Sequence, residues 1–367
     1  MPSPATVLIT GGAGFVGSHL ADELLDYGYR VRVLDNLTEQ VHGAGEEFPS
    51  YLSPEVERIR GDVRDPEAVA AALEGANAVY HLAAAVGVGQ SMEAIEHYAD
   101  VNVRGTAVLL EALAKHPVDR LVVASSMSVY GEGLCRRRDF STCSPALRTA
   151  EQLRRCEWEL QDEEQRPLQP VETAESKPPD PASIYALTKY AQERMCLLFG
   201  RTYGVPAVAL RFFNIYGPRQ ALTNPYTGVL AIFSSRYLNS QPPVIFEDGL
   251  QLRDFVSVHD VKRACRLALE CTDADGRVFN VGTGQRHRIL DVAHLIGRLL
   301  GSPLKPRIAN EYRAGDIRHC IADISRARAV LGYEPQVRLE EGLAELVEWL
   351  RETAPEVRDA EAAKGGR

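Results

Sequence analysis

The chain has 367 residues, of which 45% are hydrophobic and 25% charged, a composition that is typical of globular proteins and excludes disordered or collagen-like chains. With 41 Lys and Arg against 50 Asp and Glu the formal net charge is −9, so we expect no nucleic-acid partner. No apolar run approaches the ~18 residues that span a bilayer and residues 1–10 lack a secretory pattern, so neither a membrane segment nor a signal peptide is expected.

Strands and helices alternate through the first 130 residues. Between the first two strands, Val16, Leu20 and Leu24 recur at helical spacing, and residues 101–113 carry a second helical pattern. Short apolar runs predict buried strands at 7–9, 30–35, 77–82 and 120–125. This alternation predicts an α/β fold with a Rossmann-type, doubly wound parallel sheet covered by helices on both faces.

The later sequence predicts an insertion and a second, smaller domain. A long polar and proline-rich stretch is followed by helix 184–203 and strand 207–212, and then by shorter mixed elements with amphipathic helices at 290–300 and 339–350. The predicted parts are a Rossmann domain over 1–216 that contains an insertion at about 131–181 and a helix from 184, a mixed α/β substrate domain over 217–352, and a flexible tail over 353–367.

A glycine-rich turn joins the first strand to the first helix. Gly11, Gly14 and Gly17 are spaced three apart, and they permit a tight turn, a close approach to a pyrophosphate, and close packing of helix on strand. The N-terminus of the following helix supplies N–H groups and a partial positive charge for the phosphates. The strand before and the helix after this turn predict a dinucleotide site.

The second strand ends in a carboxylate that indicates which dinucleotide is bound. Asp35 lies 18 residues after Gly17, where it can accept hydrogen bonds from ribose hydroxyls and would repel a 2′-phosphate, so NAD is favoured over NADP. The remaining residues that we expect at the cofactor are Phe15, Val16, Asn36, Asp62, Val63, Leu82, Ala83, Ala84, Asn102, Tyr185 and Lys189.

A tyrosine and a lysine four residues apart provide a candidate catalytic pair. Tyr185 and Lys189 share one face of the predicted helix 184–203. An ammonium near a phenol, together with the charge of NAD⁺, lowers the tyrosine pKa from about 10 and makes the phenol a usable general base. At the end of the strand 120–125, a hydroxyl of Ser125 or Ser126 could hydrogen-bond the reacting oxygen.

These features together resemble the extended short-chain dehydrogenases/reductases of the nucleotide-sugar epimerase/dehydratase family. The resemblance covers roughly residues 5–350. The matching motifs are the glycine turn 11–17, Asp62-Val63, residues 81–84, 102–106, 125–131, Tyr185-x-x-x-Lys189, residues 211–218, 253–261 and 280–284, and Arg313-x-Gly315-Asp316.

The resemblance implies a role for each matching residue. Tyr185 is the general base, Lys189 tunes it and binds the nicotinamide ribose, and Ser126 aligns the substrate hydroxyl. Asn214 and Arg253 are expected to hold the diphosphate of a nucleotide sugar, a dianion for which fixed Arg donors are suited. The other residues expected at the substrate are Met127, Ser128, Arg219, Arg313 and Asp316.

The two residues that directly follow Ser126 distinguish between the reactions of this family. Family dehydratases carry Asp-Glu at these positions and decarboxylases keep the Glu, whereas this chain has Met127 and Ser128, which are neither acids nor bases near neutral pH. The resemblance therefore favours C4 epimerisation of a UDP- or dTDP-hexose through a transient 4-keto sugar, with tightly bound NAD. The alternatives are a reductase of 4-keto sugars, a decarboxylase on the same fold, and a catalytically inactive NAD-binding sensor or scaffold.

The insertion is about twice as long as the corresponding segment of typical 4-epimerases. It resembles the enlarged loop of a subgroup that includes dTDP-L-rhamnose 4-epimerase-like enzymes, and it is expected to be a lid or a subunit contact. Its three cysteines (Cys135, Cys143 and Cys156) have no C-x-x-C spacing, so we predict no metal site. The seven cysteines of the chain indicate reduced thiols and a cytoplasmic protein. The helices near 101–113 and 184–203 resemble those that form the family's homodimer.

Overall fold

A seven-stranded parallel sheet forms the centre of the protein, as the sequence predicts. The computed structural model describes residues 5–45, 47–220, 228–313 and 315–362, with side chains described up to residue 353. From one edge to the other the strands are β15 (Val278–Val281), β10 (Ala207–Phe212), β5 (Arg120–Ser126), β4 (Ala78–His81), β1 (Thr6–Thr10), β2 (Arg30–Asp35) and β3 (Glu57–Arg60). Every pairing in this sheet is parallel.

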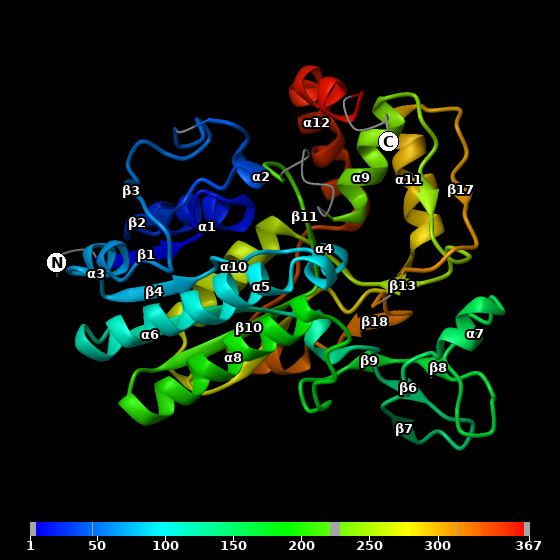
Figure 1. The fold of residues 1–367 in the computed structure, drawn as a ribbon, viewed down its shortest axis with the longest axis horizontal. Coiled ribbons are helices and arrows are strands. Elements are labelled where there is room, and N and C mark those ends of the chain that lie inside the picture. The colour runs from blue at the N-terminus through cyan, green and yellow to red at the C-terminus, as the bar shows by residue number, and fades with distance from the viewer. Residues whose placement is uncertain (1–4, 46, 221–227, 314, 363–367) are drawn as a thin grey trace.

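Helices cover both faces of the sheet (Figure 1) because successive strand residues point to opposite sides. In β1, Val7 and Ile9 join the core beneath α1 (Phe15–Asp26) and α10 (Val258–Glu270), whereas Leu8 joins the core on the other face. The helices on that second face are α3 (Pro66–Leu73), α6 (Gly105–Lys115) and α8 (Ile184–Tyr203). Short helical segments complete this region: α2 (Glu39–His42), α4 (Val88–Glu93), α5 (Ile95–Tyr98), η1 (Ala99–Arg104) and η2 (Met127–Tyr130).

Helix α8 has the bounds that the sequence predicts, because both of its ends are encoded locally. The Ser183 hydroxyl caps its start by accepting a hydrogen bond from the Ala186 N–H at 3.1 Å. Its end is formed by Gly204 in the left-handed conformation, at φ +72°.

A second core lies beyond the carboxyl end of the sheet. It forms between α9 (Val229–Leu238), α11 (Ile289–Leu300) and α12 (Leu339–Ala362). Small sheets accompany these helices: β11 (Asn214–Tyr216) with β14 (Phe255–Ser257), β12 (Val244–Ile245) with β17 (Arg307–Ile308), and β16 (His287–Arg288), β13 (Leu252–Arg253), β18 (His319–Ala322) and β9 (Glu172–Thr173) in one sheet. The remaining segments are η3 (Thr272–Ala274) and η4 (Ala327–Leu331).

The chain crosses between the two predicted domains more often than the boundary at 216 implies. Helix α10 and strand β15 follow residue 216 in sequence, yet they pack on and extend the seven-stranded sheet. Conversely, β9 precedes residue 216 and belongs to the sheet that carries Arg253. These contacts join residues far apart in the sequence, so periodicity alone does not reveal them.

The insertion is folded and contains regular structure. It holds β6 (Cys135–Arg136), β7 (Thr142–Cys143), α7 (Ala150–Arg154) and β8 (Gln169–Pro170), and the three strands pair as an antiparallel sheet. Its own small core consists of Cys135, Leu160 and Leu168, with Cys143 packed against them. Figure 1 shows this unit beside β9, β18 and β13, away from the β1 end of the main sheet.

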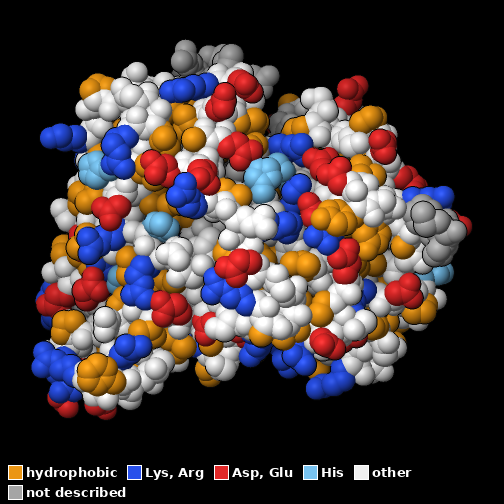
Figure 2. Space-filling model, turned by 180° about the vertical axis from the view of Figure 1, so that it is seen from behind, with side chains coloured by type: hydrophobic (Ala, Val, Ile, Leu, Met, Phe, Trp, Pro, Cys, Tyr) orange, Lys and Arg blue, Asp and Glu red, His pale blue; other side chains and the backbone are white. Residues whose placement is uncertain are grey.

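The last helix is longer than the sequence predicts. It continues to Ala362, past residue 353, where the sequence predicts the start of a flexible tail, and this stretch is rich in the helix-favouring residues Ala, Glu and Arg. Residues 363–367 lie outside the described part. Within the described residues no helix is both long and apolar enough to span a membrane. Figure 2 shows Lys and Arg interspersed with Asp and Glu over one face of the molecule.

Candidate active site

The glycine positions of the turn between β1 and α1 are closely packed against the backbone. Gly11 has φ +70°, and a Cβ there would lie 2.8 Å from the backbone nitrogen of Ala83, two residues after β4. A Cβ at Gly17 would lie 2.5 Å from the Gly11 carbonyl oxygen. Gly14 caps α1 without a side-chain hydrogen bond, and the first amides of a helix have no intrahelical acceptor.

This turn lies where the order of the strands reverses, because β2 and β3 lie on one side of β1 and β4 and β5 lie on the other. A crevice at such a position, next to a helix N-terminus, is where open α/β sheets bind dinucleotides. Phe15 and Val16 begin α1 at this point. The geometry therefore fits the pyrophosphate of the predicted cofactor.

Asp35 organises the turn from the end of β2. One of its carboxylate oxygens accepts the Ala13 N–H at 3.0 Å and the other accepts the Leu37 N–H at 2.9 Å. Each carboxylate oxygen has a second lone pair, so these bonds leave acceptor capacity for the ribose hydroxyls that the sequence assigns to it.

Asn36 follows β2 and Asp62 follows β3, with Val63 next to Asp62. The Asn36 amide donates to Asp62 at 2.9 Å, and Arg64 donates to the same carboxylate at 2.7 Å. These hydrogen bonds, chiefly those from Arg64, hold the pKa of Asp62 well below its usual range. Asp62 is therefore an ionised anchor at the carboxyl end of the sheet.

Asn102 holds the loop that follows β4. Its amide oxygen accepts the Ala85 N–H at 2.8 Å, and its amide nitrogen donates to the Ala85 carbonyl at 3.1 Å and to Thr188 at 3.0 Å. The residue thus ties the loop containing Leu82, Ala83 and Ala84 to α8. A direct contact between Asn102 and the cofactor stays a prediction.

Ser126 and Tyr185 meet through their hydroxyl groups. Ser126 ends β5 and Tyr185 lies in the first turn of α8, so elements 59 residues apart in sequence bring them together. Burial raises the pKa of Tyr185, although its hydrogen bond with Ser126 opposes that shift. The lowering expected from Lys189 together with NAD⁺ concerns the cofactor-bound site and stays a prediction.

Lys189 is buried and contacts Gln192, a residue that the sequence analysis missed. Its ammonium donates to the Gln192 amide oxygen at 2.7 Å, and Gln192 in turn lies 3.2 Å from His81. Burial lowers the pKa of Lys189 to about 8. The position of Gln192, three residues after Lys189 on the same helix, is the sequence signal that could have identified it.

His81 is a structural residue of this network. It is fully buried, with Nδ1 2.9 Å from the Thr10 hydroxyl and Nε2 2.9 Å from the Thr106 hydroxyl. Burial lowers the pKa of His81 to about 3, so the ring is neutral at physiological pH.

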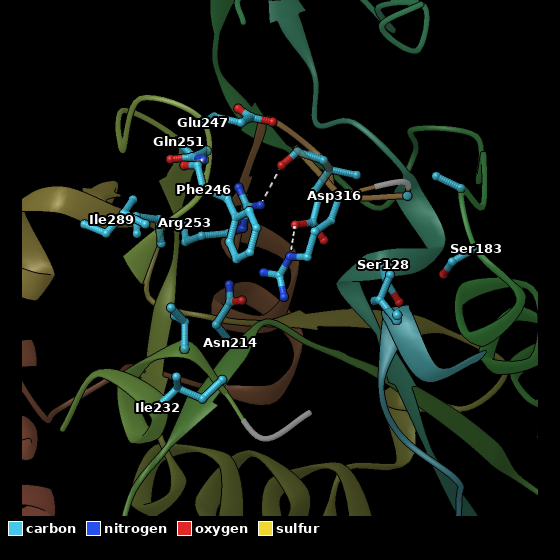
Figure 3. Close-up of a pocket in the computed structure, with 18 of the residues that line it drawn as sticks. Ser128, Ser183, Asn214, Ile232, Phe246, Glu247, Gln251, Arg253, Ile289 and Asp316 are labelled. Carbon is cyan, nitrogen blue, oxygen red and sulfur yellow. Dashed lines mark hydrogen bonds and ion pairs between the residues drawn. The ribbon is translucent and has the colours of Figure 1, made fainter. Parts of the chain in front are cut away.

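A cavity of about 350 Å³ extends from the catalytic helix to the C-terminal core (Figure 3). Ser128 and Ser183 lie at one end, while Ile232, Ile289 and Gln251 lie at the other. Met127 and Ala186 also line it. Ser183 and Ala186 precede and follow Tyr185 in the sequence and line this cavity, whereas Tyr185 and Ser126 are not among its lining residues.

Two predicted diphosphate ligands lie in the middle of the cavity wall. The Arg253 guanidinium donates to the carbonyls of Ile317 at 2.6 Å and Arg318 at 2.8 Å, which fixes its position. The Asn214 amide donates to the Asp254 carbonyl at 2.9 Å. Both side chains are thus held by backbone carbonyls at the cavity surface.

Arg313 and Asp316 also line the cavity, whereas Arg219 does not. Arg313 pairs with Asp316 at 3.2 Å, and its guanidinium carbon lies 4.2 Å from the centre of the Phe246 ring. Arg219 instead donates to Asp22 of α1 at 2.7 Å. An acidic partner on α1 thus places Arg219 on the cofactor side, outside the lining of this cavity.

The structure adds several lining residues that spacing did not indicate, among them Phe246, Glu247 and Gln251. The Gln251 side chain donates to the Phe246 carbonyl at 2.8 Å, and its amide oxygen is buried without a hydrogen-bond partner. Gln251 precedes Arg253 by two residues, so its proximity to a recognised motif was the available signal. Across the described residues, no group of three or more His, Cys, Asp or Glu is arranged to hold a metal ion.

Comparisons with known proteins agree with this geometry. The family described as "NAD dependent epimerase/dehydratase family" matches residues 7–282. A dTDP-L-rhamnose 4-epimerase of Burkholderia thailandensis is 37% identical over 348 residues, covering 94% of each chain. A crystal structure of UDP-glucose 4-epimerase with UDP-glucose from Thermotoga maritima is 33% identical, with a TM-score of 0.78 over 95% of this chain and 99% of that one. A Thermus thermophilus UDP-glucose 4-epimerase in complex with NAD is 31% identical, with a TM-score of 0.76 over 94% and 99% of the two chains.

Proposed function

The chain belongs to the NAD dependent epimerase/dehydratase family, and on that basis we propose that it epimerises a nucleotide-activated hexose at C4 through a transient 4-keto sugar. The observation that carries this proposal is the hydrogen-bonded pair Ser126 and Tyr185, whose sequence neighbours Met127 and Ala186 line the cavity. The absence of an acid or base at Met127 and Ser128 favours epimerisation over dehydration or decarboxylation. The relatives that act on dTDP- and UDP-sugars support either nucleotide.

The proposed chemistry begins at Tyr185. As the phenolate, Tyr185 takes the proton of the C4 hydroxyl, which Ser126 aligns by hydrogen bonding. Bound NAD would supply the acceptor and donor of the C4 hydride, and its positively charged ring would favour the ionised Tyr185. Lys189 adds positive charge below its pKa of about 8. After the sugar presents its other face, Tyr185 returns the proton to the C4 oxygen, so the cycle leaves no net redox change.

The diphosphate and the nucleobase of the substrate are assigned to the rest of the cavity. We propose that Asn214, Arg253 and Arg313 hold the diphosphate, and that residues 217–352 mainly bind the nucleotide sugar while residues 1–216 bind NAD. Charged Arg donors suit this role because hydrogen bonds to phosphate oxygens are stronger when the donor carries a charge. The apolar end near Ile232 and Ile289 suits a nucleobase.

We also propose that the protein is a cytoplasmic homodimer. Leu187, Leu198 and Tyr203 of α8 are 53%, 42% and 61% exposed, which leaves apolar surface for a second copy. Sedimentation velocity is expected to give about twice the chain mass of 40.4 kDa, and a species of monomer mass would contradict the dimer.

The reaction can be tested without adding cofactor. The purified protein is incubated with UDP- and dTDP-hexoses, including dTDP-L-rhamnose, and the products are followed by proton NMR and mass spectrometry. We expect a C4 epimer of unchanged mass, formed with NAD that the protein retains from expression. Loss of water or carbon dioxide, or turnover only of a keto sugar with added NADPH, would refute the epimerase assignment.

A further inference from the structure

The insertion reaches the substrate cavity through one buried arginine. The Arg148 side chain is only 3% exposed although it comes from a polar segment. Its Nη1 donates to the Glu247 carboxylate at 2.7 Å and its Nη2 donates to the Asp316 carbonyl at 3.1 Å. Glu247 and Asp316 both line the cavity, on two separate chain segments. Arg148 therefore bridges two walls of the cavity.

A second ion pair joins the insertion to the same region, and here the insertion supplies the carboxylate instead of the cation. Glu159 of the insertion accepts hydrogen bonds from Arg318, whose side chain is fully buried, and from His319 at 3.0 Å. Burial opposes ionisation of Glu159, but the bonds from His319 and Arg318 outweigh it and lower its pKa to about 2. Arg318 also pairs with the second oxygen of Glu247 at 2.8 Å. Glu247 is thus held on one side by the insertion and on the other by residue 318.

Glu247, which joins these ion pairs, has a strained backbone conformation. Glu247 has φ +54°, a region that non-glycine residues rarely adopt, and its side chain is 3% exposed. Strain of this kind persists where the surroundings fix the residue. Phe246, which stacks with Arg313, directly precedes Glu247. Holding Glu247 therefore also holds the nucleotide end of the cavity.

The insertion makes these contacts to the C-terminal half. Gly133, just before β6, donates its N–H to the His319 carbonyl at 2.7 Å, and β9 pairs with β18. Strand β18 in turn pairs with β13, which carries Arg253. The insertion is therefore continuous with the sheet that carries Arg253, one of the proposed diphosphate ligands.

We propose that Arg148 is a positioning residue for substrate binding: through Glu247 and the Asp316 carbonyl, it fixes the spacing of the two segments that form the nucleotide end of the cavity. The insertion then determines affinity for the nucleotide half of the substrate, while the proton transfer at Tyr185 is left unchanged. This inference rests on the proposed function, because it takes the cavity to be the nucleotide-sugar site.

The test compares Arg148→Met with the matched control Arg155→Met in the full-length protein. Arg155 lies in the same insertion, but its side chain is 53% exposed, and its ion pairs within the described part of the chain are with the insertion residues Glu151 and Glu157. For Arg148→Met we expect KM for the nucleotide sugar and the Kd for free UDP or dTDP to rise by about tenfold, as the loss of a charged hydrogen bond implies. We expect kcat to change less than about twofold and the content of bound NAD to stay unchanged. Arg155→Met is expected to match the wild type.

Two further variants keep the proposal falsifiable if Arg148→Met is unstable. Arg148→Lys retains the charge and should recover part of the affinity. Combining Arg148→Met with Glu132→Gln also removes the buried carboxylate that lies 3.6 Å from Arg148 Nε, so that this carboxylate is not left without its cation. A folded variant with unchanged KM and Kd, or one whose kcat falls together with its NAD content, would overturn the inference. A wild-type protein that binds UDP or dTDP but turns over no sugar would contradict the proposed function alone, and one that binds neither nucleotide would refute both.

Discussion

Replacing Tyr185 with Phe removes a single hydroxyl from the site, and the structure separates its effect on stability from its effect on catalysis. The ring stays in its packing, with Tyr98 edge-on at 6.4 Å between ring centres. The hydroxyl makes a hydrogen bond with Ser126, and such a bond contributes about 1 kcal/mol to stability. We therefore expect a folded Tyr185→Phe protein with nearly normal thermal stability.

The catalytic effect should be much larger. A positioned general base contributes about 10²- to 10⁴-fold to the rate. At 1.36 kcal/mol per tenfold, this corresponds to about 2.7–5.4 kcal/mol of barrier, several times the stability term. Because the glycine turn and Asp35 lie on β1, α1 and β2, away from this hydroxyl, retention of NAD should not change.

The assay measures kcat for the active nucleotide sugar and the NAD released on denaturation. Tyr203→Phe is the matched control, because Tyr203 lies at the end of the same helix and is 61% exposed. If Tyr185→Phe keeps more than about a tenth of the wild-type kcat, the general-base assignment is refuted. If the variant loses both turnover and NAD, the loss of rate cannot be attributed to proton transfer.

Three other predictions test the cofactor turn and the core. Gly17→Ala places a Cβ 2.5 Å from a backbone carbonyl, so we expect it to lose bound NAD and thermal stability, whereas Gly45→Ala, with open space around it, should behave as wild type. His81 has a folded pKa of about 3 against 6.5 when unfolded, so protonation of the unfolded chain lowers stability as pH falls from 6.5 toward 3, by up to about 1.4 kcal/mol per pH unit. Denaturant titrations of wild type and His81→Gln at several pH values should show a shallower acid slope in the variant, and equal slopes would contradict this. Arg211→Met removes the cation that lies 2.6 Å from Glu193, whose side chain is 1% exposed, so we expect urea unfolding to show a fall of about 3–5 kcal/mol in the free energy of unfolding. A fall below about 1 kcal/mol would mean that Glu193 is accommodated in another way.

Elements whose signals come from neighbouring residues could be predicted from the amino-acid sequence alone. The alternation of apolar strands and helical periods predicts the parallel sheet, and Ser183 and Gly204 define α8 because caps depend only on neighbouring residues. The glycine spacing and the four-residue offset of Tyr185 and Lys189 likewise place chemistry on one turn and on one helix face. The resemblance to a known family added the residues of the substrate pocket.

Only the tertiary structure decided which distant residues meet. Arg148 and Glu247 are 99 positions apart, and Arg318 and Glu159 are 159 apart, so no local period connects them. The same reason explains why α10 and β15 return to the first sheet and why the insertion folds against the C-terminal half. Ion pairs and sheet edges form between surfaces that exist only once the chain has folded, whereas helix and strand signals come from residues adjacent in sequence.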